Sequence, residues 1–327
     1  MKAVVLKSFG GPEVLSISEV PTPQPGSEEI LIKIQAVGVN RADLLERQGM
    51  YPPPGPTPTF QIPGLECAGT VVSVGQNVQQ FAPGDRVMAL LSGGGYAQYT
   101  VCHERLALPI PTHIETIDAG GIPEVFLTAY DALFDKASLT MGDRVLIHAG
   151  ASGVGSAAIQ LARSAGLRIA STVGSQPKQQ AAQGWGADLV INYRDHSWLK
   201  ALREWAPEGV QGVLDFIGQS YFSDNLDSLS PGGTLVVIGT LSGNEAAIPL
   251  GTLLARRLTI RGTALRSRPL EDKMRLVQQF RGHALPGADK GDWAPVVDRV
   301  FNWQHVADAH RYMASNGNIG KIILAVD

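Results

Sequence analysis

The chain has 327 residues, of which 44% are hydrophobic and 17% charged, and its formal net charge is -3. This length exceeds what one hydrophobic core usually organises, so we expect two domains. The small negative charge is untypical of proteins that bind nucleic acid or anionic membranes, which leaves small molecules as the expected partners. No stretch approaches the roughly 20 apolar residues that a spanning helix needs, and the start reads as a strand and not as a signal peptide. We therefore expect a cytoplasmic protein.

The first segment carries short β-rich runs at Ala3–Leu6, Glu29–Ile34 and Gly69–Val74, separated by turns rich in proline and glycine. This pattern predicts a small β-barrel. The proline-rich stretches 20–26 and 51–56 are excluded from helices and central strands, because proline lacks an amide donor and restrains the residue before it. The second stretch begins with Tyr51, and such a stiff loop can form one wall of a substrate site.

Cysteine and histidine usage bears on metals and disulfides. Cys67 and Cys102 are the only cysteines, and neither lies in a ligand spacing, so a disulfide framework is excluded. The seven histidines form no H-x-x-x-H pair. A long-range zinc site of Cys67, Cys102 and His103 is the alternative. Because zinc sites usually contain local ligand pairs, we predict no metal.

From about Ile122 strands and helices alternate. This pattern predicts a parallel sheet covered by helices on both faces, the doubly wound architecture. In the tail we expect a helix at Leu270–Phe280 and a last strand at Gly320–Val326 that can rejoin the first domain. The predicted domains are 1–121 completed by 265–327, and 122–264. The predicted strands are Arg144–Ala149, Leu167–Val173, Leu189–Ile191, Gly212–Phe216 and Thr234–Gly239, with helices at Gly155–Ala165 and Gln176–Trp185.

The most informative stretch joins the first of these strands to its helix through Gly150, Gly153 and Gly155. Glycines permit a tight turn and let the backbone approach a pyrophosphate, and the helix N-terminus adds free amides and a positive dipole end. The spacing departs from G-x-G-x-x-G, so an ordinary glycine-rich loop is the alternative. The flanking strand and helix favour a dinucleotide site.

A second interpretation of this turn makes Ser152 a hydrolase nucleophile. Residues 150–152 fit the first half of a G-x-S-x-G elbow. The second half fails, because Val154 stands where the elbow needs glycine. We reject the hydrolase.

The second strand decides between the two nicotinamide cofactors. Sites specific for NAD place an acidic residue about 20 positions beyond the turn, yet no Asp or Glu lies between Gly155 and Asp188. Instead Ser175 can donate a hydrogen bond and Lys178 a positive charge to a 2'-phosphate. We therefore predict NADPH. For Lys178 the alternative is an ordinary solvated helix lysine.

Several motifs together resemble the medium-chain dehydrogenase/reductase superfamily, in its zinc-free quinone oxidoreductase branch with zeta-crystallin. The likeness spans the whole chain. Residues 148–155 and 316–321 resemble the tumour-suppressor-inducible quinone oxidoreductases in particular. The matching motifs are Met1–Val4, Gly10–Leu15, Gly38–Asp43, Gly49–Pro52, Gly64–Gly69, Pro83–Val87 and Leu127–Tyr130.

The resemblance implies an α/β protein with a GroES-like β-barrel domain and a Rossmann domain. In the zinc alcohol dehydrogenases of this superfamily a Cys stands at the position of Asn40 and a His at that of Leu65, so both ligands are absent here. Without a Lewis acid, alcohol oxidation loses transition-state stabilisation, whereas an electron-poor quinone or enone needs less help. The family turn has glycine at the position of Ser152, whose hydroxyl can still bind phosphate.

The resemblance also implies site residues. For catalysis we expect Asn40, Asp43 and Tyr51, with Asn40 donating a hydrogen bond to the substrate oxygen and Tyr51 donating a proton or stacking. Alternatively, Asn40 only shapes the pocket, and Asp43 caps the helix around Leu44–Arg47. Tyr193, assigned to the 2'-phosphate, has a packing role at a strand end as its alternative. The expected cofactor ligands are Asn40, Thr128, Ser152, Gly153, Val154, Gly155, Gly174, Ser175, Lys178, Tyr193, Ile238, Leu265, Arg266, Ser267 and Asn318.

The resulting prediction is an NADPH-dependent quinone oxidoreductase that works without zinc. The alternatives are an NADPH-dependent enoyl or alkenal reductase and a non-catalytic, crystallin-like NADPH-binding protein. Family habit implies a homodimer, joined near Leu235–Ile238.

Overall fold

The computed structural model describes residues 1–56, 58–195 and 197–327. It divides into two compact units, Met1–Leu127 with Leu265–Asp327, and Thr128–Ala264. We call them unit 1 and unit 2 and describe each by itself. The predicted domain boundary at 121/122 lies six residues before the first division, and α3 (Pro123–Tyr130) spans that division.

Unit 1 is built on a largely antiparallel sheet of seven strands. The order along the sheet is β14-β15-β3-β4-β5-β7, and β6 pairs with β3 away from this path. The last strand pairs with β3, where Ile322 lies opposite Val39, so the predicted return of the chain end to the first domain is confirmed. Strands β1 (Lys2–Leu6) and β2 (Leu15–Glu19) form a separate pair. The sheet strands are β3 Glu29–Val39, β4 Glu66–Val74, β5 Arg86–Leu90, β6 Tyr99–His103, β7 Ala107–Pro109, β14 Val297–Asn302 and β15 Lys321–Ala325.

Helices pack around this sheet. The longest, α9, begins at Leu270 as predicted but ends at His283 and not at Phe280. Its extra turn carries Arg281 and His283, and positive charge is favoured at a helix C-terminus. Unit 1 also contains α1 Arg41–Arg47, α2 Thr116–Ala119, α10 Leu285–Asp289 and α11 Val306–Ala314.

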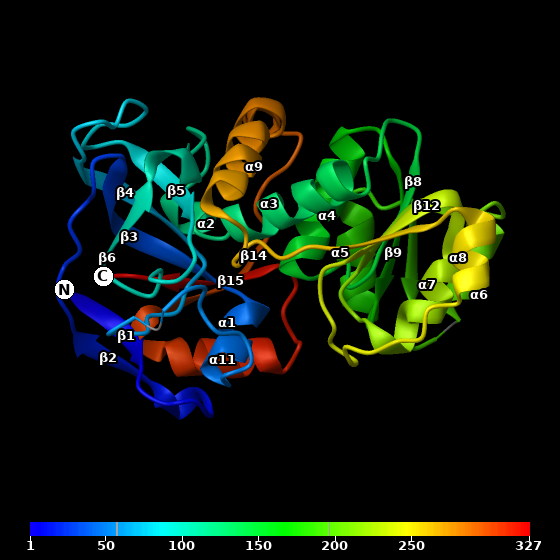
Figure 1. The fold of residues 1–327 in the computed structure, drawn as a ribbon, viewed down its shortest axis with the longest axis horizontal. Helices are drawn as coiled ribbons and strands as arrows, with labels where there is room; N and C mark the ends of the chain where they lie inside the picture. The colour runs from blue at the N-terminus through cyan, green and yellow to red at the C-terminus, as the bar shows by residue number, and fades with distance from the viewer. Residues whose placement is uncertain (57, 196) are drawn as a thin grey trace. The chain divides into compact units, whose positions relative to one another are not determined.

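Unit 2 has the predicted doubly wound fold. Its six strands are all parallel, in the order β10-β9-β8-β11-β12-β13. In Figure 1, α4 and α5 lie on one side of the sheet and α6, α7 and α8 on the other. The strands are β8 Arg144–Ile147, β9 Arg168–Val173, β10 Leu189–Asn192, β11 Val210–Asp215, β12 Leu229–Val237 and β13 Thr259–Gly262. The helices are α4 Gly153–Ser164, α5 Gln176–Gly184, α6 Trp198–Trp205, α7 Phe222–Ser228 and α8 Leu250–Arg256.

The strand order of unit 2 indicates at which edge of the sheet a ligand is expected to bind. The chain runs from β8 outward to β10 and then crosses to β11 on the other side of β8. In open parallel sheets ligands bind beyond the carboxyl ends of the strands, where the order reverses in this way. Here that point lies between β8 and β11.

Two predicted boundaries next to this point were wrong by two residues. The first strand ends at Ile147, because Ala149 has a φ of +50° and has left the extended conformation. Helix α4 begins at Gly153 and not at Gly155, because the Ser152 side chain caps it. The turn therefore keeps its expected length but lies two residues earlier in the chain than predicted.

None of the helices within the described residues has the length and apolar character needed to cross a membrane.

Candidate active site

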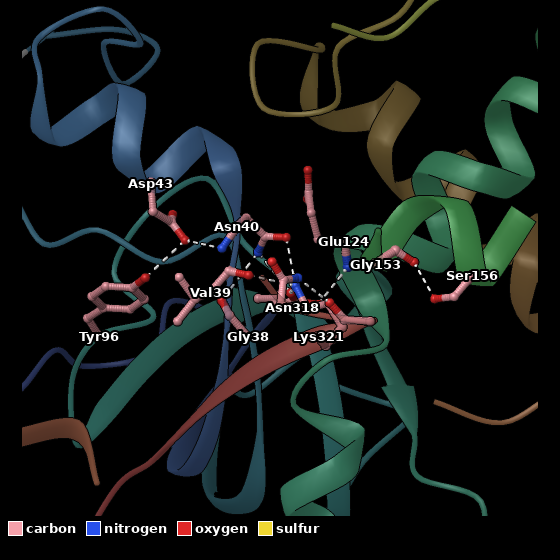
Figure 2. A network of polar contacts seen from close by, with 12 residues as sticks. Gly38, Val39, Asn40, Asp43, Tyr96, Glu124, Gly153, Ser156, Asn318 and Lys321 are labelled. Carbon is pink, nitrogen blue, oxygen red and sulfur yellow. Dashed lines mark hydrogen bonds and ion pairs between the residues drawn. The ribbon is translucent and has the colours of Figure 1, made fainter. Parts of the chain in front are cut away.

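The glycine turn of unit 2 presents the start of α4 at the carboxyl end of β8. The Ser152 hydroxyl oxygen accepts a hydrogen bond from Gly155 N at 3.0 Å, and Ser156 Oγ donates to Gly153 O at 2.9 Å (Figure 2). These two bonds fix the first turn of the helix. No acidic side chain lies in that turn, so nothing there opposes an anion at the positive end of the helix.

Glycine is needed in this turn because backbone segments approach each other. A Cβ on Gly155 would lie 2.7 Å from Gly150 Cα and would overlap the Ala149 carbonyl oxygen. A Cβ on Gly150 would overlap Ser171 Oγ. A side chain at position 155 would force the turn open, and one at position 150 would displace the Ser171 hydroxyl, which donates a hydrogen bond to Ile147 O. The cradle thus fits a pyrophosphate, which is bound by backbone amides at close range.

His148 lies beneath the turn and is buried. Its Nδ1 is 2.9 Å from Thr172 Oγ1 and its Nε2 is 2.7 Å from Asn225 Oδ1, so the ring joins β8 to β9 and α7. Burial lowers the pKa of His148 to about 4, so the ring is neutral at pH 7. His148 therefore supports the turn without placing a charge under it.

The carboxyl ends of β9 and β10 bring together residues predicted to bind the 2'-phosphate. Tyr193 N donates to Val173 O at 3.0 Å, and the Tyr193 ring lies over Gly174, where a Cβ would be 2.5 Å from Tyr193 Oη. Ser175 then precedes α5 without capping it, and Lys178 stands in the first turn of α5, which contains no acid.

The next acid along the chain points to the opposite edge of the sheet. Asp188 Oδ2 accepts a hydrogen bond from Ile169 N at 2.6 Å, at the amino-terminal ends of β9 and β10. Asp188 is thus removed from the place where an acid would bind the ribose hydroxyls of NAD.

The ends of β11 and β12 complete this edge. Asp215 is buried, and its carboxylate accepts from Ile217 N at 2.7 Å and Gly218 N at 3.2 Å. The Asp215 carbonyl accepts from Ile238 N at 2.8 Å. Ile238, predicted to line the nicotinamide end, therefore has its backbone fixed against the neighbouring strand end.

Unit 1 holds a buried polar cluster centred on Asn40 (Figure 2). Lys321 Nζ donates to Val39 O at 3.0 Å, to Asn40 Oδ1 at 2.7 Å and to Glu66 Oε1 at 2.7 Å. Asn40 Nδ2 donates to Gly38 O at 3.2 Å and to Glu66 Oε1 at 2.8 Å. The ammonium has three N–H groups and the amide two, so all five are used inside the cluster. Asn40, the predicted donor to the substrate oxygen, is here held by its own neighbours.

Asp43 lies next to this cluster, fully buried on α1. Its Oδ2 accepts from Asn40 N at 2.7 Å, which is the capping contact considered above, and from Tyr96 Oη at 3.0 Å. Tyr96 Oη is also 3.1 Å from His310 Nε2. Asp43 Oδ1 has no partner within the described part of the chain, and burial raises the pKa of Asp43 to about 7. A catalytic role for Asp43 stays a prediction.

Tyr51 is held in place by Arg266. The buried guanidinium donates to Tyr51 O at 2.8 Å, to Ser92 O at 3.0 Å and to Glu46 Oε1 at 2.8 Å, and it lies 5.3 Å from the Tyr51 ring centre. Arg266, predicted at the cofactor, thus fixes the proline-rich loop to α1 in this structure. It is an anchor that the loop sequence itself does not reveal.

Two side chains of unit 1 carry a hydroxyl or carboxyl group that makes no hydrogen bond among the described residues. Across residues 1–56, 58–195 and 197–327, neither the Tyr51 hydroxyl nor the Glu124 carboxyl makes a hydrogen bond. The Glu124 backbone amide is tied to the cluster, since it donates to Glu66 Oε2 at 2.9 Å. Burial and the Glu66 charge raise the pKa of Glu124 to about 8. Burial and the Glu124 charge raise the pKa of Tyr51 above its usual 10.

The remaining predicted residues occupy separate positions. Thr128 is buried on α3 in unit 2. In unit 1, Leu265 is buried, Ser267 is exposed, and Asn318 Nδ2 donates to Gly320 O at 2.7 Å in the turn before β15. Their roles at the cofactor stay predictions.

Five functional candidates were missed from the sequence. Glu66 and Lys321 stand inside quoted motifs, G-L-E-C-A-G and N-I-G-K, and a charged residue inside an apolar strand was the available signal. Glu124 follows a proline at a helix start, which resembles an ordinary first-turn acid. Tyr96 and His310 carry no local signal, because their contact spans 214 positions.

The residues present do not fit a zinc site. Among all residues that the structure describes, no group of three or more His, Cys, Asp or Glu side chains is placed to hold a metal ion. In the long-range alternative, His103 Nδ1 accepts from Arg105 N at 3.1 Å, and burial raises the pKa of Cys102 to about 12. A thiol ligand must lose its proton to bind zinc, and such a pKa opposes that loss.

Two family models match different parts of the chain. Residues 26–112 match the family model described as "Alcohol dehydrogenase GroES-like domain", and residues 153–280 match "Zinc-binding dehydrogenase". The quinone oxidoreductase of Rattus norvegicus is 34% identical over 333 residues, covering 99% of this chain and 97% of that protein.

Two solved structures extend the likeness to three dimensions. The Escherichia coli quinone oxidoreductase complexed with NADPH is 28% identical with a TM-score of 0.89, over 99% of this chain and 100% of that one. The CurK enoyl reductase is 27% identical with a TM-score of 0.89, over 100% of this chain and 99% of that one.

Proposed function

Because the chain belongs to the medium-chain dehydrogenase/reductase superfamily, among the zeta-crystallin-like quinone oxidoreductases, we propose that it reduces quinones with NADPH and without zinc. The coarser statement, an oxidoreductase of this superfamily, follows from full-length relatives above 30% identity. The cofactor, the metal independence and the quinone are our proposal.

One observation carries the choice of NADPH. The 150–155 turn and the strand end at Gly174 lie at the same edge of the sheet, and the first turns of α4 and α5, which follow them, contain no acid to bind ribose hydroxyls or repel a phosphate. Gly153, Val154 and Gly155 would hold the pyrophosphate, and Ser175, Lys178 and Tyr193 the 2'-phosphate. The complex of the E. coli relative with NADPH supports this assignment.

When bound, the reduced nicotinamide supplies a hydride. The chain's own residues must then position the acceptor and provide a proton. Unit 1 offers neutral donors for this task, the Tyr51 hydroxyl and the Glu124 carboxyl, and it excludes water from the buried cluster around Asn40. Delocalisation of charge in a quinone or enone lowers the need for a Lewis acid. The absence of a fitting metal-ligand group among the described side chains supports a zinc-free reaction.

An NADPH-dependent enoyl reductase is the second candidate, favoured by the likeness to the CurK enoyl reductase over the whole chain. It needs the same hydride and the same proton donor. A non-catalytic NADPH-binding role is the third reading.

NADPH consumption by the purified protein, measured with a series of quinones, enals and alcohols, separates these candidates. We expect quinone turnover, no alcohol oxidation and no effect of a metal chelator. Turnover of enals alone would favour the enoyl reductase, and tight NADPH binding without any turnover would favour the binding protein. Stoichiometric zinc in the active protein, or failure to bind NADPH by calorimetry, would refute the proposal.

A further inference from the structure

The buried cluster of unit 1 contains an acid whose carboxyl group it leaves unused. Lys321, Asn40 and Glu66 satisfy one another, and Asp43 is held by a backbone amide and Tyr96. Glu124 alone contributes its backbone amide and keeps its side chain out of the network. Figure 2 shows that side chain extending away from the hydrogen bonds around Asn40 and Lys321.

Hydrogen bonds through Glu66 connect the backbone of Glu124 to the cluster. The Glu124 amide donates to Glu66 Oε2 at 2.9 Å, and the other oxygen of that carboxylate accepts from Asn40 and Lys321. Position 124 is thus two hydrogen bonds from Asn40, the residue that the family resemblance places at the substrate. The start of α3 is therefore tied rigidly to the cluster.

Tyr51 provides the second reference point. The Glu124 charge acts on the Tyr51 hydroxyl strongly enough to rank second among the causes of its raised pKa. Tyr51 is in turn anchored by Arg266 through its carbonyl and its ring. Two side chains with uncommitted O–H groups thus interact electrostatically, and each is attached to an anchored backbone segment.

We propose that Glu124 is the catalytic acid that delivers the proton to the reduced substrate, an inference that rests on the proposed reductase function. A quinone that has accepted a hydride is a hydroquinone monoanion. The Glu124 O–H bond breaks, a new O–H bond forms on the anionic oxygen, and Glu124 becomes a carboxylate that regains a proton from water. The sum is quinone plus NADPH plus H⁺ giving hydroquinone plus NADP⁺.

The charges around Glu124 keep it protonated before the step. Burial is the largest cause of its raised pKa, followed by the Glu66 carboxylate. A pKa of about 8 leaves most of the carboxyl protonated at pH 7. The titratable groups that interact electrostatically with it are Glu66 on β4, Lys321 on β15, Asp43 on α1, Lys273 on α9 and Tyr51 on the proline-rich loop.

Acid strength favours Glu124 over Tyr51 as the proton donor. A hydroquinone oxygen is phenolic, and the tyrosine phenol has an ordinary pKa of about 10. Glu124 is a stronger acid than such a phenol, so proton transfer to the anion runs downhill. Tyr51 is a weaker one, because its own pKa is raised above 10. Tyr51 is then left to position or stack on the substrate.

The test is Glu124→Gln, which keeps the shape and removes the acid. We expect quinone turnover to fall about 100-fold, the usual scale of general acid catalysis, with the Kd for NADPH unchanged. In the wild type we expect turnover to decline above pH 8, and this decline to be absent from the residual activity of the variant. Glu115→Gln, at an exposed carboxyl of the same unit, is the matched control.

Three outcomes would overturn the assignment. One is a variant whose turnover stays within twofold of the wild type with the same pH profile. Another is loss of turnover in Tyr51→Phe but not in Glu124→Gln, which would make Tyr51 the acid. The third outcome does not depend on activity. In a ¹³C-NMR titration, the signal of the Glu124 carboxyl carbon is identified as the one that is missing from Glu124→Gln. Titration of this signal at the ordinary glutamate pKa of about 4.3 would contradict the assignment. A wild type that binds NADPH but reduces no quinone would instead refute the proposed function, and the titration would still test the held proton.

Discussion

The glycine turn of unit 2 and the polar cluster of unit 1 are built in opposite ways. The turn is contiguous, residues 150–155, and works through backbone amides and missing side chains. The cluster joins positions 40, 66, 124 and 321, and works through buried charges. A change in the turn should therefore alter cofactor binding first, whereas a change in the cluster should alter the stability of the fold first.

The largest effect is expected from Lys321→Met. Lys321 makes three hydrogen bonds in the core, and its loss leaves the buried Glu66 carboxylate without a counter-ion. Breaking such a pair costs about 3–5 kcal/mol of unfolding free energy. Urea unfolding checks this, with Lys290→Met at an exposed position as the control. A loss below about 1 kcal/mol would mean that the cluster does not depend on this charge.

Gly155→Ala should act on the other region. The added Cβ meets the backbone of Ala149 and Gly150, and such overpacking costs about 1–3 kcal/mol. Because relief requires the turn to move, we expect the Kd for NADPH to rise roughly tenfold or more. Gly184→Ala on α5 is the control, since a Cβ there has nothing within 4 Å and alanine favours the helix. Equal NADPH affinity in both variants would contradict the close-packed turn.

Lys178→Ala sharpens the cofactor assignment. If the ammonium contacts the 2'-phosphate, its loss removes a charge-assisted hydrogen bond and raises the Kd for NADPH roughly tenfold while leaving that for NADH unchanged. Calorimetry with both nucleotides measures the difference. Lys200→Ala, an exposed lysine of α6, should change neither. A parallel loss for both nucleotides would show that Lys178 acts on the fold and not on the phosphate.

The stability of the fold should also depend on pH. Burial raises the pKa of Asp43 to about 7 and of Glu124 to about 8, so above about pH 4 the folded chain binds more protons than the unfolded one. The free energy of unfolding contributed by these groups therefore falls as pH rises to 7–8. His148 acts in the opposite direction, since its lowered pKa of about 4 costs stability as pH falls from 6.5 to 4.

Urea midpoints at pH 6 and pH 9 measure this contribution. We expect Glu124→Gln to lose less stability between the two values than the wild type, because the substituted amide does not ionise. Glu115→Gln should behave like the wild type. An identical loss in all three proteins would place the Glu124 pKa outside this range.

Much of the fold was predictable from local pattern. Continuous apolar runs such as Val213–Leu214 predicted buried parallel strands, and all five predicted strands of the second segment correspond to β8 to β12. The errors fell where backbone geometry overrides pattern. Ala149 ends β8 early by adopting a positive φ, and Ser152 starts α4 early by capping it. Cap and turn geometry depend on single side chains. Hydrophobic periodicity therefore does not predict them.

The site was predictable to a different extent in each unit. Around the turn, Gly174 and Tyr193 are indeed in contact, and the position of Asp188 at the far edge agrees with the missing acid. In unit 1, Asn40 was predicted to donate a hydrogen bond to the substrate oxygen, but no sequence signal shows that both of its N–H groups are occupied. Saturation of a hydrogen-bonding group depends on partners that arrive from other strands.

The sequence by itself determined the glycine turn, because a turn made of backbone amides and glycines is specified by neighbours along the chain. Only the tertiary structure decided which acid of unit 1 is free to act. Strand pairing brings β3, β4 and β15 together, so Lys321 neutralises Glu66 and leaves Glu124 without a partner among the described residues. Desolvation and hydrogen-bond saturation are set by those distant neighbours, and the proposed role of Glu124 depends on both.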